Sequence, residues 1–123
     1  MASIIDFKGL YEWCQIPVDK LENHPDLKMK LKIFDTKEEV IQWAADDLIK
    51  EVKKKNEEGK PTRWILPCGP TKQYPIFADV VNQERISLKN THIFHMDDLL
   101  DWQTQLLPLD HPLTFQGWMR RRL

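Results

Sequence analysis

From Lys30 to Met96 the sequence alternates between short apolar runs and longer amphipathic segments, and this alternation limits the possible folds most strongly. Residues 30–34 (KLKIF), 63–66 (RWIL) and 91–96 (THIFHM) have the length and composition of strands. Residues 36–58 and 71–86 lie between them and are predicted to be helices. This order is typical of parallel strands connected by helices. We therefore predict an α/β fold with an open parallel sheet and flanking helices.

The first predicted helix has the clearest pattern. Asp35 and Thr36 supply a start signal, and Gly59 and Pro61 supply a stop. Between these signals, apolar residues recur at steps of three and four, which predicts one buried face. These residues are Val40, Ile41, Ala44, Leu48, Ile49 and Val52.

The two ends of the chain are less regular. Residues 1–29 are expected to form an irregular extension that packs on the domain, because Pro17 and Pro25 interrupt its apolar clusters. Residues 30–123 would form the domain. Its last segment predicts a helix with Pro112 at the first helical position and Asp110 or His111 as the cap.

Composition excludes several classes of protein. The 18 Lys and Arg residues are balanced by 19 Asp and Glu residues, so neither nucleic acid nor an anionic membrane is an expected partner. The chain has no long apolar run and begins without a secretory signal pattern, which predicts a cytoplasmic protein. Cys14 and Cys68 follow no metal-binding spacing and are expected to be free thiols.

In open parallel sheets, ligands bind beyond the carboxyl ends of the strands. Residues 67–72 (PCGPTK) follow the second predicted strand and suit a phosphate group. Gly69 permits close backbone approach, Thr71 offers a hydroxyl and Lys72 offers a charge. The spacing is not that of a P-loop, and an ordinary turn is the alternative interpretation.

A second candidate segment, Met96-Asp97-Asp98, follows the third predicted strand. Strand alternation places His95 and Asp97 on one side and His92 on the other, which argues against a metal site formed by these three residues. Asp97 is a candidate general base, whereas Asp98 is expected to be a helix cap or an orienting group. A packed core histidine is the alternative interpretation for His95.

Four segments taken in order resemble the amino-terminal half of glucosamine-6-phosphate deaminases (isomerases), relatives of 6-phosphogluconolactonase. They are KIFDTKEEVIQWAADDLI, WILPCGPTKQYPIF, ISLKNTHIFHMDDLLDW and LLPLDHPLTFQGWM. The resemblance runs from about residue 29 to residue 119. It implies a Rossmann-like fold that converts an amino sugar phosphate to a ketose phosphate and ammonia, with no cofactor and no metal.

The resemblance also implies roles for individual residues. Asp97 and Asp98 match the family's catalytic Met-Asp-Glu motif, with Asp97 as the base that moves a proton between C2 and C1 of the open-chain sugar. The remaining matches are substrate-binding residues. They are Cys68, Gly69, Pro70, Thr71 and Lys72 in the phosphate loop, His95 beside Asp97, and His111 in the acidic-His-Pro segment with Asp110 and Thr114.

Two residues depart from the family's Pro-Thr-Gly-Gly-Thr loop. Cys68 replaces a threonine and Pro70 replaces a glycine, which removes a hydroxyl and a backbone N–H donor. The family's later segment, which opens the sugar ring with His, Asp and Glu, has no counterpart in this sequence. The resemblance thus implies the first half of a larger domain, whose chemistry this chain alone does not complete.

Three functional hypotheses follow. The first is the deaminase and isomerase reaction, and the second is a sensor domain that binds a sugar phosphate without catalysis. The third is a remnant that folds only with a partner chain and exposes apolar surface where further strands would pair. The sequence leaves open whether the protein forms a homo-oligomer.

Overall fold

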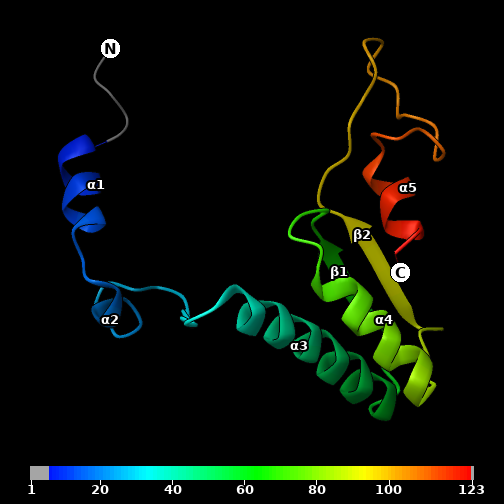
Figure 1. Ribbon diagram of the computed structural model, residues 1–123, viewed down its shortest axis with the longest axis horizontal. Coiled ribbons are helices and arrows are strands. Elements are labelled where there is room, and N and C mark those ends of the chain that lie inside the picture. Colours follow the sequence, from blue (N-terminus) through cyan, green and yellow to red (C-terminus); the bar gives the residue numbers. More distant parts are fainter. Residues whose placement is uncertain (1–5, 123) are drawn as a thin grey trace. The chain divides into compact units, whose positions relative to one another are not determined.

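The computed structural model describes residues 6–122. They fall into two compact units that meet in the sequence between Asp35 and Thr36. The second unit contains a parallel pair of strands flanked by helices, which is consistent with the predicted α/β class (Figure 1). No helix among the described residues is both long and apolar enough to cross a membrane.

The first unit contains two short helices, α1 (Phe7–Cys14) and α2 (Val18–Leu21), where an irregular segment was predicted. Asp6 explains α1, because its carboxylate accepts hydrogen bonds from the backbone N–H groups of Lys8 and Gly9, both at 3.1 Å. Pro17 precedes α2 as its N-cap residue, so this proline starts a helix rather than only interrupting one. The predicted packing of residues 1–29 on the domain stays a prediction.

The predicted strand at residues 30–34 is absent from the structure, and this prediction was wrong. The first unit contains no strand among its described residues that could pair with this segment. Without a partner strand, the backbone N–H and C=O groups of an extended segment need other hydrogen-bond partners. The backbone N–H of Ile33 instead donates to Oε1 of Glu22, 2.6 Å away.

The second unit begins with α3 (Lys37–Glu57), which confirms the predicted helix. Thr36 and Glu39 form a reciprocal capping box at its start, and Gly59 follows its end with a φ of 64°, a conformation that glycine adopts without strain. The buried face is displaced slightly from the predicted one, since Val40 is exposed. The buried residues of α3 are Ile41, Ala45, Ile49 and Val52.

The sheet pairs β1 (Thr62–Leu66) with β2 (Thr91–His95), and α4 (Gln73–Glu84) connects them. In the parallel register Trp64 lies beside Ile93 and Leu66 beside His95, so these four residues share one face. Helices α3 and α4 pack against each other, and both supply residues to the core on this face (Figure 1). The core cluster consists of Ile49, Val52, Trp64, Leu66, Tyr74, Phe77, Val81 and Met119.

The opposite face of the sheet is open to solvent. Ile65 and Phe94 are paired in register there and are 69% and 56% exposed. Met96, just beyond β2, is 63% exposed. The second unit therefore has one covered and one uncovered sheet face among its described residues.

The last helix, α5 (Phe115–Arg120), begins three residues later than predicted. Its N-cap is Thr114, not Asp110 or His111, so this boundary was predicted wrongly. Pro112 instead lies in the turn before the helix, where His111 Nδ1 accepts a hydrogen bond from the N–H of Leu113 at 3.2 Å. Proline suits a turn as well as a first helical turn, which explains the ambiguity.

Candidate functional site

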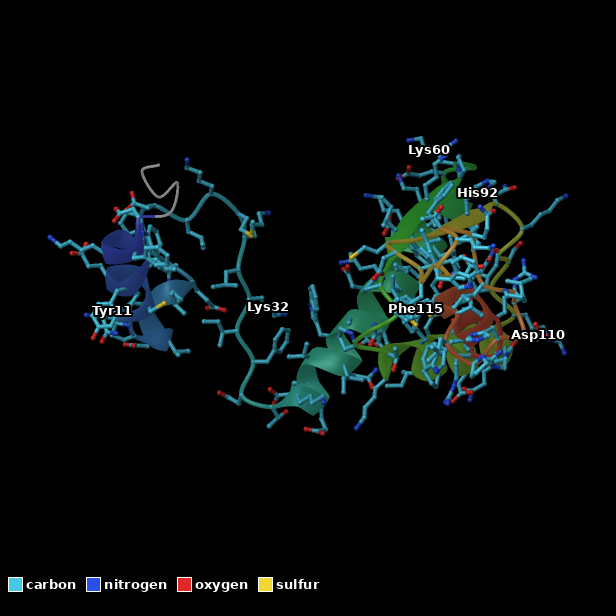
Figure 2. The ribbon with its side chains drawn as sticks, turned by 90° about the horizontal axis from the view of Figure 1, so that it is seen from above. Tyr11, Lys32, Lys60, His92, Asp110 and Phe115 are labelled. Carbon is cyan, nitrogen blue, oxygen red and sulfur yellow. The ribbon has the colours of Figure 1, made fainter. Side chains whose placement is uncertain are left out.

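The candidate site lies where the two parallel strands end. The loop of residues 67–72 follows β1, the Asp97-Asp98 pair follows β2, and the start of α5 lies against both. Figure 2 shows Phe115 and Asp110 well away from His92, which lies toward Lys60 near the amino ends of the strands. The structure thus separates His92 from the candidate site.

Two side chains of α4 hold the loop after β1. The hydroxyl of Tyr74 donates to the carbonyl oxygen of Pro67 at 2.6 Å, and Nε2 of Gln73 donates to that of Pro70 at 2.7 Å. Both side chains are buried, so the loop is fixed from the core side. Gly69 is exposed, and a Cβ atom added there would meet nothing within 4 Å. The peptide bond between Gly69 and Pro70 is cis.

Asp98 joins the end of β2 to the start of α5. Its carboxylate accepts hydrogen bonds from the N–H groups of Phe115 at 2.8 Å and Gln116 at 3.1 Å, and from the hydroxyl of Thr114 at 3.1 Å. The N–H of Leu99 donates to it at 2.8 Å. No helix begins at Asp98, so it is not the N-cap residue of a following helix; it instead holds the start of α5 from a separate segment, as an orienting group would. A catalytic role for it stays a prediction.

The pKa of Asp98 is lowered by these contacts. Partial burial raises the pKa of the carboxyl, but the hydrogen bonds from Phe115, Gln116, Leu99 and Thr114 together outweigh it. Each of these donors stabilises the ionised carboxylate. Asp98 is thus suited to fixing backbone positions as an anion.

Asp97 has a different environment, because its side chain is exposed. It lies close enough to Cys68 that its charge acts on the thiol. The pKa of Cys68 is raised, first by burial and then by the negative charges of Asp97 and Asp98. The structure therefore brings together Cys68 from the first predicted loop and both aspartates from the second.

A cavity of about 320 Å³ lies beside this group. Cys68 and Thr71 line it from the β1 loop, and Thr114 lines it at the start of α5. The remaining lining residues are largely apolar, and several belong to the acidic-His-Pro segment that the family resemblance implies as a wall of the cleft. They are Leu99, Pro112, Leu113, Phe115 and Trp118.

Three predicted binding residues lie elsewhere. Lys72 lines a separate cavity between α3 and α4, together with Glu38 and Gln42. His95 lines another cavity, on the side of β2 that faces α5. His111 belongs to the turn before α5. The structure therefore places only two of the predicted binding residues, Cys68 and Thr71, on the wall of the 320 Å³ cavity. The predicted site residues that do not line it are Gly69, Pro70, Lys72, His95, His111, Asp97 and Asp98.

Metal-ligating side chains do not cluster in residues 6–122, where no group of three or more His, Cys, Asp or Glu residues could hold an ion. What the site offers chemically is an exposed carboxylate at a strand end, a fixed loop, and a largely apolar cavity with Thr71 and Thr114 on its wall. No protein-family model matches the chain, and no solved structure matches it either.

Proposed function

We propose that this chain carries the proton-transfer part of an amino sugar phosphate isomerase, which converts glucosamine-6-phosphate to fructose-6-phosphate and ammonia. The observation that carries the proposal is the position of Asp97. It follows β2 directly, acts electrostatically on Cys68, and stands next to Asp98, which ties the strand end to α5. A Rossmann-like sheet that extends this parallel pair is part of the same proposal.

The reaction requires a general base, and a positioned carboxylate can serve as one. In the open-chain sugar, the hydrogen at C2 is acidified by the neighbouring aldehyde, and Asp97 accepts it as a proton. Returning the proton to C1 leaves an imine at C2, which adds water and releases ammonia. Asp98 contributes by holding the turn, because its hydrogen bonds to Phe115 and Gln116 fix the backbone next to Asp97.

The phosphate group would lie against the β1 loop. Thr71 offers a hydroxyl on the cavity wall, and Gly69 leaves the backbone approachable. Tyr74 and Gln73 support this role because they fix the loop before any ligand arrives. Lys72 is directed to a different cavity, so the proposal assigns the phosphate to backbone N–H groups and Thr71.

Exchange of deuterium from heavy water into C1 of fructose-6-phosphate tests the proton-transfer step separately from ring opening and deamination. The ketose samples its open-chain form without a ring-opening catalyst, so a competent base should introduce deuterium at C1 in heavy water. We expect exchange above the protein-free rate, measured by proton NMR, and its loss in Asp97→Asn. The matched control Asp79→Asn removes an exposed carboxylate from α4 and should exchange like the wild type. Equal exchange in Asp97→Asn would remove Asp97 from the mechanism.

One observation favours a second candidate, a sugar phosphate sensor domain without catalysis. Asp97 is exposed, whereas a carboxylate base acts best in a water-poor cleft. Titration with glucosamine-6-phosphate, followed by amide chemical shifts of the β1 loop, separates the two candidates. Saturable binding without exchange would favour the sensor, and the absence of both would overturn the sugar phosphate assignment.

A further inference from the structure

A second cavity lies between β2 and α5, on the covered face of the sheet. Its volume is about 390 Å³, and none of its lining residues lines the 320 Å³ cavity. Six residues line it. Three are apolar, namely Leu88, Ile93 and Met119, and three are polar, namely His95, Gln116 and Arg120.

His95 provides the first argument for a ligand. Its Nδ1 atom is buried and has no hydrogen-bond partner within residues 6–122. Buried ring nitrogens in native proteins nearly always have a partner, because an unpaired polar atom away from water is unfavourable. His95 is also one of the residues that line the cavity, so its imidazole ring forms part of the polar wall.

The spacing of polar residues on α5 provides the second argument. Gln116 and Arg120 are four residues apart, which puts both on the same side of the helix. That side faces the cavity, as the lining residues show. The guanidinium of Arg120 can donate two parallel hydrogen bonds to a carboxylate, and the Gln116 amide can add a third.

The geometry points to a binding site for a small organic acid with a short apolar tail. The carboxylate would lie against Arg120 and Gln116, with the imidazole ring of His95 beside it. The tail would lie against Leu88, Ile93 and Met119. Arg120 is the only Lys or Arg residue that lines this cavity, and three of the other lining residues are apolar. Such a lining suits an acid with one negative charge better than a phosphate group, because a second buried charge would have no partner. This site is separate from the proposed sugar phosphate site.

Titration of the full ¹⁵N-labelled chain with hexanoate tests the site. We expect saturating shifts of amide signals from β2 and α5, and no saturation with neutral hexanamide. Arg120→Gln should weaken hexanoate binding by about tenfold or more, the loss typical of a charged hydrogen bond. Arg121→Gln removes the same charge one residue along, outside the cavity lining, and should change the affinity by less than about twofold.

A second variant examines the buried nitrogen. His95→Leu should weaken hexanoate binding while the protein stays folded, because leucine leaves no polar atom unpaired. Asp97→Asn should leave hexanoate binding unchanged, because Asp97 does not line this cavity. The hexanoate test can therefore fail or succeed independently of the test of the sugar phosphate site. Equal weakening by Arg120→Gln and Arg121→Gln would overturn the site, as would shifts that never saturate. Inorganic phosphate displacing hexanoate at equal concentration would overturn the choice of a carboxylate.

Discussion

Two adjacent aspartates at the end of β2 illustrate how neighbouring residues acquire different roles. Asp98 accepts four hydrogen bonds and is half-buried, whereas Asp97 is exposed and acts on Cys68 only through its charge. The sequence predicted separate roles for them, a general base for Asp97 and a cap or an orienting group for Asp98. The sequence could not show which backbone N–H groups of α5 Asp98 would bind, because they lie 17 and 18 residues further along.

The first prediction at the residue scale concerns Asp98. Asp98→Asn should lower the free energy of unfolding by about 1–2 kcal/mol at pH 7, as expected for the loss of a charged cap. The folded pKa is below the unfolded value of about 3.9, so this stabilisation is present above that pH and is lost as the pH falls through the folded pKa. Urea unfolding from pH 7 to pH 2 should show the difference from wild type disappearing below about pH 4. Asp97→Asn, at an exposed position, is the matched control, and an equal loss there would contradict the cap role.

The second prediction concerns the thiol of Cys68. Because the Asp97 charge contributes to its raised pKa, Asp97→Asn should lower that pKa and increase the fraction of reactive thiolate. Alkylation by iodoacetamide at pH 8, followed for each cysteine by mass spectrometry, should accelerate about twofold to fivefold. Exposed Cys14 is the internal reference and should react at the same rate in both proteins. An unchanged Cys68 rate would show that the Asp97 charge does not contribute to the raised pKa of Cys68.

At the scale of elements, the position of α5 depends on a close approach between Gly117 and the backbone carbonyl group of Leu109. A Cβ atom added at Gly117 would lie 1.9 Å from the carbonyl oxygen of Leu109 and 2.7 Å from Cγ2 of Thr114. The oxygen belongs to the backbone, so it cannot move aside as a flexible side chain could. Gly117 thus permits α5 to lie against the segment that precedes it.

Gly117→Ala should therefore destabilise the second unit by about 1–3 kcal/mol, the usual range for overpacking. Thermal unfolding measures the loss, and the α5 amides should also exchange faster with solvent. Gly69→Ala is the control, because a Cβ atom there meets nothing within 4 Å and should change stability by less than about 0.5 kcal/mol. A stable Gly117→Ala protein would mean that α5 can shift without cost.

The elements that could be predicted from sequence are those with a strong local pattern. The start signals and periodicity of α3 located that helix closely, and the apolar runs located β1 and β2. The missing strand at residues 30–34 and the late start of α5 depended on distant groups, Glu22 in the first case and Asp98 in the second. Among the cavity residues, Leu99 and Trp118 escaped prediction, whereas the segment 110–115 was expected at the wall of the cleft only from the family resemblance.

At the scale of the whole molecule, the uncovered sheet face should affect how the chain behaves in solution. Exposed Ile65 and Phe94 lie side by side on that face, and a two-stranded sheet has unpaired edges. We expect the protein to associate as its concentration rises. Ile65→Lys should reduce that association, measured by light scattering, and change the unfolding free energy by less than about 0.5 kcal/mol.

Trp64→Ala provides the contrast, because Trp64 is buried in the core and donates a hydrogen bond to Glu51 at 2.8 Å. Its loss should cost about 3–5 kcal/mol of stability. Association that is unaffected by Ile65→Lys would show that another surface is responsible. The remnant hypothesis predicted exposed apolar surface where further strands would pair, which is at a sheet edge rather than on a sheet face, and it stays a prediction.

Asp98 also closes a loop, since its hydrogen bonds join the end of β2 to Phe115, 17 residues along the chain. Within this loop Leu100 and Leu106 form a bridge, and Asp101 accepts hydrogen bonds from Gln103 and Gln105. The entropy lost on closing a flexible loop grows only with the logarithm of its length, by about 0.6 kcal/mol per doubling. Residues inserted at the loop tip should therefore cost little, and the tip could be lengthened, or carry a grafted segment, while the cavity walls stay in place.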